Sequence, residues 1–112
     1  MLRLSKKTDY ALIALAYVAS IGNKPTSARD IAERHDIPVE LLAKVLQRLV
    51  QKGMLKSQQG IHGGYVLARA ADTMTVAEIV EAIDGLHLTF PKVSKDHVAE
   101  LANVRKRLIA ER

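Results

Sequence analysis

The chain has 112 residues, 48% of them hydrophobic, which is enough for one compact domain and at most one appended element. Its 17 Lys and Arg outnumber 12 Asp and Glu, and the net charge of +5 favours a polyanionic partner. The absence of cysteine excludes disulfides, thiolate nucleophiles and cysteine-ligated zinc or iron–sulfur sites. The longest uncharged run, residues 10–23, is shorter than a membrane span, so we expect a cytoplasmic protein with no membrane partner.

The first predicted helix covers residues 6–20 and is apolar almost all round. Such a helix needs cover on both sides, and the core of one small domain supplies only one. A partner subunit is the simplest second cover, so Leu12, Leu15 and Ala16 are predicted to lie in a homodimer interface. The alternative is a central helix of a monomer.

Two short amphipathic helices follow, separated by Ile37-Pro38. Ser27 is the predicted N-cap of the first, with Asp30 as a short version of the capping-box acid. Pro38 suits the first turn of the next helix, and Gly53 suits a helix end, which places that helix at residues 39–52. The pattern predicts a helix-turn-helix.

The helix at 39–52 has two faces at 100° per residue. The apolar face holds Leu42, Val45, Leu46, Leu49 and Val50. The polar face holds Glu40, Lys44, Gln47, Arg48 and Gln51. An ordinary solvated helix would have the same polar face, but its place after the turn makes it a candidate recognition surface for DNA.

Residues 55–59 and 65–67 are predicted strands joined by a loop that contains Gly60, Gly63 and Gly64. A glycine-rich hairpin alone indicates only a turn, whereas directly after the recognition helix it indicates a wing. Residues 1–65 contain ten Lys and Arg against five Asp and Glu, while residues 66–112 contain seven of each. The whole charge surplus therefore lies in the predicted reading unit.

Thr75 and Glu78 form a predicted capping box for a fourth helix that ends at Asp84-Gly85. Residues 86–93 are a predicted connector, and Ser94 is the predicted N-cap of a last helix. Its apolar residues are spaced alternately by three and four, as in a short coiled coil or in a helix docked on its own domain. They are Leu101, Val104 and Leu108.

The predicted fold is mainly α with a small β-hairpin wing: a winged helix-turn-helix domain at 1–85, a connector at 86–93 and a dimerisation helix at 94–112. Five segments in order resemble the IscR-like (Rrf-two) family of bacterial winged-helix transcription regulators. They are 1–12 (MLRLSKKTDYAL), 27–34 (SARDIAER), 46–53 (LQRLVQKG), 63–67 (GGYVL) and 80–85 (VEAIDG).

The resemblance implies a homodimer that binds a palindromic operator on double-stranded DNA. Many such regulators sense through an iron–sulfur cluster held by three cysteines after the fourth helix, where this chain has none. No cofactor is therefore expected, and neither is a redox response.

In the leading hypothesis, the protein is a repressor that anchors phosphates near its amino terminus and second helix, reads bases with the third helix and probes a minor groove with the wing. The predicted DNA-binding residues are Ser5, Lys6, Lys7, Ser27, Glu40, Lys44, Gln47, Arg48, Gln59, Gly60, His62, Gly63 and Tyr65.

Two alternatives remain open. The winged helix could be a protein-interaction module, or the chain could respond to a metal or small ligand through His62, His87, His97 and Asp96. Catalysis is not expected, because the chain has neither a phosphate-loop motif nor a Gly-x-Ser-x-Gly elbow.

Overall fold

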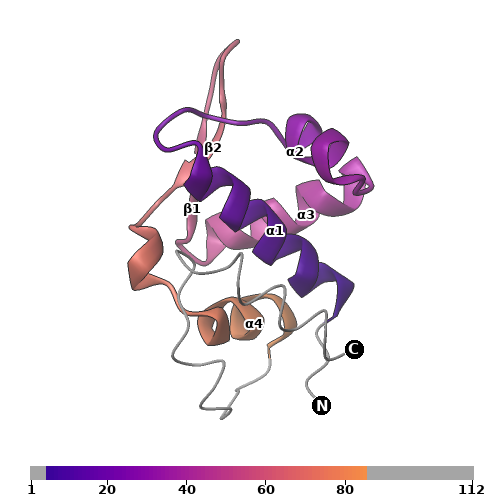
Figure 1. Cartoon of the computed structure of the whole chain (residues 1–112), viewed down its shortest axis with the longest axis vertical. Helices are drawn as coiled ribbons and strands as arrows, with labels where there is room; N and C mark the ends of the chain where they lie inside the picture. Colours follow the sequence, from indigo (N-terminus) through magenta and orange to yellow (C-terminus); the bar gives the residue numbers. More distant parts are fainter. Residues whose placement is uncertain (1–4, 86–112) are drawn as a thin grey trace.

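The computed structural model describes residues 5–85, and the predicted connector and last helix, with Leu101, Val104 and Leu108, lie outside this range (Figure 1). The predicted mainly helical fold with one hairpin is confirmed. Its elements are α1 (Lys6–Ser20), α2 (Ala28–His35), α3 (Val39–Gln51), β1 (Leu55–Gln58), β2 (Gly64–Leu67), the short 3-10 helix η1 (Ala71–Thr73) and α4 (Val76–Asp84).

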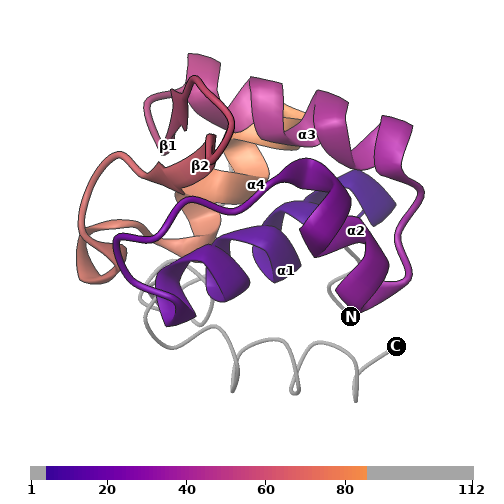
Figure 2. The same cartoon turned by 90° about the horizontal axis from the view of Figure 1, so that it is seen from above.

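Helix α1 crosses the centre of the fold and contacts α2, α3, α4 and β2 (Figure 2). Its apolar positions at core spacing meet these elements, so Leu12 and Leu15 are at most 1% exposed. Both side chains belong to the hydrophobic core of the protomer, and their contact with a second chain stays a prediction. Ala16 and Ile13 are half-buried and pack against the same core.

The helix-turn-helix begins as its sequence predicts. The Ser27 hydroxyl accepts a hydrogen bond of 3.0 Å from the Asp30 backbone N–H. The Asp30 carboxylate does not complete a capping box with the Ser27 backbone; it accepts hydrogen bonds from Thr26 and Arg34 instead. Aspartate is one methylene shorter than the glutamate of a capping box, which explains the difference. Asp36 ends α2 with a φ of 53°, a left-handed conformation that aspartate tolerates.

The hairpin stands beyond the helical body, with β1 and β2 antiparallel and Leu55 opposite Leu67 (Figure 1). After β2 the chain passes through η1 to α4, where the predicted capping box of Thr75 and Glu78 is present with both of its hydrogen bonds. Four residues of α4 are buried against α1 and α3, so α4 supports the helix that carries the polar face.

Candidate nucleic-acid interface

The outer face of α3 has the two-sided pattern that the sequence predicts. Leu42, Val45, Leu46 and Leu49 are at most 3% exposed and pack on the core. The polar residues on the other side are exposed, and a shallow depression runs along them. It is lined by Ala43, Lys44, Gln47, Arg48 and Gln51. Burial of one side thus leaves a line of hydrogen-bonding and cationic groups in solvent.

Gln47 joins this face to the wing. Its Nε2 donates a 2.9 Å hydrogen bond to the hydroxyl of Tyr65 on β2. The amide nitrogen has a second hydrogen, and the amide oxygen accepts, so the side chain keeps a donor and an acceptor for another partner. The bond therefore fixes the orientation of the Gln47 amide without using all its capacity.

Arg48 points towards α4 rather than straight outward. Its Nε donates a 3.0 Å hydrogen bond to the carbonyl oxygen of Ala82, in the last turn of α4. That carbonyl belongs to a helix end, where the final acceptors have no partner within the helix. Arg48 therefore holds α3 to α4, and only its two terminal nitrogens remain for an end-on contact with a ligand.

The wing is also tied to the start of the helix-turn-helix. The backbone of Tyr65 pairs with that of Thr26 through hydrogen bonds of 2.8 and 3.2 Å. Gly64 allows this approach, since a Cβ at its position would lie 2.5 Å from the Thr26 carbonyl oxygen. The wing, α2 and α3 are consequently held in one arrangement by Tyr65 and its neighbours.

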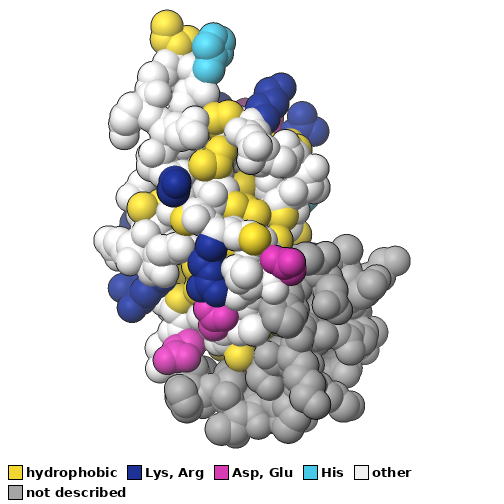
Figure 3. Space-filling model, turned by 90° about the vertical axis from the view of Figure 1, so that its left-hand side faces the viewer, with side chains coloured by type: hydrophobic (Ala, Val, Ile, Leu, Met, Phe, Trp, Pro, Cys, Tyr) yellow, Lys and Arg dark blue, Asp and Glu magenta, His cyan; other side chains and the backbone are white. Residues whose placement is uncertain are grey.

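The end of the wing reaches into solvent, with an apolar group and a histidine at its tip (Figure 3). Gln59, Gly60 and His62 are exposed, as their predicted contact role requires. Gly63 is half-buried, its amide donates to the Gly60 carbonyl at 3.0 Å, and a Cβ there would lie 2.2 Å from the Gln58 carbonyl oxygen. Gly63 therefore shapes the tight turn.

The predicted phosphate anchors at the start of α1 divide into two kinds. Lys6 and Lys7 are exposed. The Ser5 hydroxyl caps α1 by accepting from the Thr8 amide, and it donates to both carboxylate oxygens of Asp84 at 2.7 and 3.0 Å. A hydroxyl has one hydrogen, and that of Ser5 serves Asp84, so Ser5 is a structural residue in this arrangement.

Asp30 is the centre of a polar cluster at α2. It accepts hydrogen bonds from Thr26 and Tyr17 and forms an ion pair with Arg34 at 3.3 Å. Desolvation raises the pKa of this carboxyl. The pKa is lowered by a larger amount by the hydrogen bond from Thr26, by the charge and hydrogen bond of Arg34 and by the hydrogen bond from Tyr17, so the net change is downward. The Tyr17 ring also packs edge-on against His35. The cluster fixes α2 on α1 beside Ser27.

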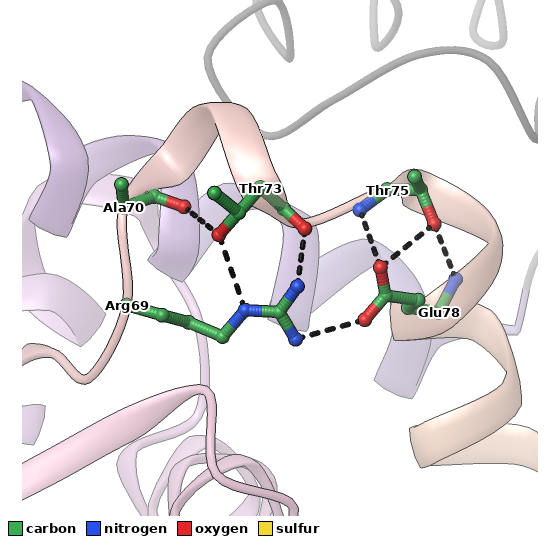
Figure 4. Close-up of polar contacts among 5 residues, drawn as sticks. All are labelled: Arg69, Ala70, Thr73, Thr75 and Glu78. Carbon is green, nitrogen blue, oxygen red and sulfur yellow. Dashed lines mark hydrogen bonds and ion pairs between the residues drawn. The ribbon is translucent and has the colours of Figure 1, made fainter.

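Arg69 fixes the segment between the wing and α4 (Figure 4). Its guanidinium donates to the hydroxyl and the carbonyl of Thr73, and its Nη1 lies 2.9 Å from Glu78 Oε2. The other Glu78 oxygen accepts from the Thr75 amide in the capping box. One carboxylate thus joins helix capping to the ion pair, which holds the base of the wing beside α4.

A family model described as Rrf2, iron-dependent transcriptional regulator, matches residues 4–110. The chain belongs to the Rrf2 family. The HTH-type transcriptional regulator IscR of Cereibacter sphaeroides is 35% identical over 86 residues, which cover 74% of this chain and 56% of that relative. The chain spans about half the length of several of the curated relatives that it matches.

Solved structures of similar regulators have the same fold. CymR, the global cysteine regulator of B. subtilis, superimposes with a TM-score of 0.81 at 24% identity, covering 93% of this chain and 98% of that one. IscR of T. potens gives a TM-score of 0.76 at 24% identity, covering 95% and 90%. The winged-helix fold and the resemblance inferred from sequence are confirmed. Members of the Rrf2 family are transcriptional regulators and not enzymes, as predicted.

The Rrf2 description names iron, but a cysteine-ligated iron–sulfur cluster does not fit the residues of this chain. The chain has no cysteine to ligate a cluster. Between residues 5 and 85, no three or more His, Asp or Glu side chains gather where they could hold a metal ion. His87, Asp96 and His97 of the alternative metal hypothesis lie outside the described residues.

Three features of this surface were not predicted from the sequence. Ile61 at the wing tip is 98% exposed and Val39 at the start of α3 is 40% exposed, although both are large apolar residues. The Asp84 carboxylate accepts hydrogen bonds from the hydroxyls of Ser5 and Thr8. The position of Ile61 between two hairpin glycines was the available signal for its exposure.

No helix in the part of the chain that the structure describes is long and apolar enough to cross a bilayer.

Proposed function

We propose that this member of the Rrf2 family is a sequence-specific DNA-binding transcription regulator that acts as a homodimer on an inverted-repeat operator. One observation carries the proposal: the exposed polar face of α3 is joined through Gln47 and Tyr65 to a wing that is itself bonded to Thr26. A recognition helix and a wing held at a fixed spacing can enter adjacent grooves of one duplex.

Cationic and hydroxyl groups around this face would anchor the DNA backbone. Lys6 and Lys7 at the start of α1 are exposed, and so is Ser27 at the start of α2. Lysines that neutralise phosphates release condensed counterions, which supplies affinity without sequence preference. These contacts would set the position of α3 along the duplex.

Base recognition is assigned to Lys44, Gln47 and Arg48 in a major groove. The Gln47 amide keeps the donor and acceptor needed for the N6 and N7 atoms of adenine. The terminal nitrogens of Arg48 can pair end-on with guanine O6 and N7 while Nε stays on Ala82. Lys44 is equally suited to a phosphate, and Glu40 in the first turn of the same face can accept from cytosine.

The wing would probe the adjacent minor groove with Gln59 and His62, which are both exposed at the end of the hairpin. In a dimer the two copies of α3 would enter major grooves about 34 Å apart, one helical turn. Ile13 and Ala16 are among the half-buried apolar residues of α1 that would contribute to such a dimer. Occupying a promoter in this way would block polymerase and repress transcription.

A salt titration tests the proposal. We expect the logarithm of the binding constant for DNA to fall linearly with the logarithm of salt concentration, by about 0.9 per phosphate neutralised. DNA fragments selected from random sequence by the wild-type protein should contain an inverted repeat, and sedimentation should show two chains per duplex. Weak binding that does not change with salt would favour the protein-interaction alternative.

Selection with a Gln47→Ala variant tests the recognition face. We expect a relaxed preference at one base position in each half-site, because the variant lacks the oriented amide. Lys44→Ala distinguishes the two roles of that lysine: it should lower the salt slope if Lys44 contacts a phosphate and change the selected motif if it contacts a base. Enrichment of an unchanged motif by both variants would reject the assigned face.

A further inference from the structure

Ile61 is an unusual residue for the tip of a solvent-facing hairpin. Its side chain is 98% exposed, whereas the other large apolar residues of the described segment are less than half exposed. Serine or asparagine would suit a free turn better, because an exposed isoleucine orders water around its whole surface. The tip of the wing therefore offers an apolar surface to a partner.

The position of Ile61 is set by the fold. Two residues after it the chain turns through Gly63, whose amide donates a hydrogen bond to the Gly60 carbonyl, and then pairs with Thr26 through Tyr65. A groove with a volume of about 430 Å³ lies beside the tip, between the wing and the start of α2. Its lining includes Ile61, Pro25, Lys24, Ser27, His62 and Asp30.

The chemistry of the groove is mixed in a way that suits one kind of occupant. Ile61 and Pro25 offer hydrocarbon, while Lys24 and Ser27 offer a cation and a hydroxyl. Asp30 is the one acidic residue in the lining, and its carboxylate is bonded to Thr26 and paired with Arg34. A deoxyribose-phosphate strand combines an apolar sugar edge with an anionic phosphate, so it offers a counterpart to both kinds of group.

We infer that this groove holds one DNA strand at the edge of the minor groove, with Ile61 packed on a deoxyribose and Lys24 near the adjacent phosphate. The inference rests on the proposed function and adds an uncharged contact to it. Burying an isoleucine side chain strengthens binding through lost apolar surface and not through counterion release. The Ile61 contact should therefore change affinity while leaving its salt dependence unaltered.

The experiment compares Ile61→Ser, Ile61→Leu and Lys24→Ala on a duplex that carries the motif selected by the wild-type protein from random DNA. We expect Ile61→Ser to raise Kd about tenfold with an unchanged salt slope. Ile61→Leu, which retains the apolar surface, should bind within about twofold of wild type. Lys24→Ala should lower the slope by about 0.9.

The outcomes separate this inference from the function on which it rests. Because Ile61 is exposed, its serine variant should unfold at the same temperature as wild type, so a loss of affinity reports on the contact. Equal DNA affinity of wild type and Ile61→Ser would overturn the inference alone, as would a weaker affinity that comes with a lower salt slope. Failure of the wild-type protein to bind any duplex would overturn both, and loss of self-association in Ile61→Ser would assign the tip to a second copy.

Discussion

The two sides of α3 use polar groups in opposite ways. On the side of α4, Thr8 is fully buried, and it and Ser5 direct their hydroxyls to Asp84, while Arg48 satisfies a carbonyl at the end of α4. On the side of the wing, Lys44, Gln59 and His62 extend into solvent. The first side uses its hydrogen bonds to hold the fold together, and the second leaves its polar groups exposed for the proposed DNA contacts. Gln47 and Arg48 lie at the border and serve both purposes.

The largest expected effect comes from Gly64→Ala, which would detach the wing from Thr26. The added Cβ would lie 2.5 Å from the Thr26 carbonyl oxygen, at a φ of +152° that alanine rarely adopts. We expect a loss of about 3 kcal/mol in the free energy of unfolding, measured by urea denaturation.

Gly53→Ala is the matched control, because Gly53 also has a positive φ, of +77°, but nothing lies within 4 Å of its added Cβ. Its free energy of unfolding should fall by only about 1 kcal/mol, the cost of placing alanine in a left-handed conformation. If the two variants were equally stable, the contact between the wing and Thr26 would not contribute to the stability of the fold.

Thr8→Val tests the side that faces α4. Valine keeps the shape of threonine but removes the hydroxyl that donates to Asp84 at 2.8 Å in a fully buried position. We expect a loss of about 2 kcal/mol in stability, with DNA affinity unchanged once the protein is folded. Ser5→Ala is the control at the exposed end of the same cluster and should cost less. A Thr8→Val protein with wild-type stability but altered DNA affinity would show that the side facing α4 contributes to DNA binding and not to the stability of the fold.

Arg48→Ala and Gln47→Ala sharpen the border between the sides. Arg48→Ala removes the link to Ala82 as well as a proposed base contact, so it should lose about 1 kcal/mol of stability and about tenfold in DNA affinity. Gln47→Ala should lose a similar factor in affinity with little change in stability, because its bond to Tyr65 is exposed. Thermal unfolding and DNA titration of both variants provide the comparison. Loss of affinity without loss of stability in Arg48→Ala would make it a reading residue only.

The smallest effect is expected from Asp30→Asn, which should change how the stability of the protein depends on pH. Its pKa is lower in the folded protein than in the unfolded chain, so its contribution to stability is present above the unfolded value and is lost as pH falls through the folded value. As pH falls below the ordinary aspartate pKa of about 4, Asp30→Asn should therefore lose less thermal stability than wild type. Asp72→Asn, in an exposed position on η1, is the control. Parallel pH profiles for Asp30→Asn and wild type would show that the cluster on α2 adds no acid-dependent stability.

The sequence by itself determined the local elements of this protein. Apolar spacing defined α1 and both faces of α3, Ser27 and Thr75 marked two helix starts, and the order of the motifs identified the family. Each of these features depends on residues only a few positions apart, where helical and strand geometry follow directly from the chain.

Tertiary structure decided which polar groups are used inside the molecule. Ser5 and Asp84 are 79 residues apart in the sequence, and Arg48 and Ala82 are 34 apart, so no periodicity could predict that they meet. The same applies to Leu12 and Leu15, whose burial in the core depends on how the elements around α1 pack. Periodicity defines the face on which a side chain lies, and only the packing of distant segments determines what covers that face.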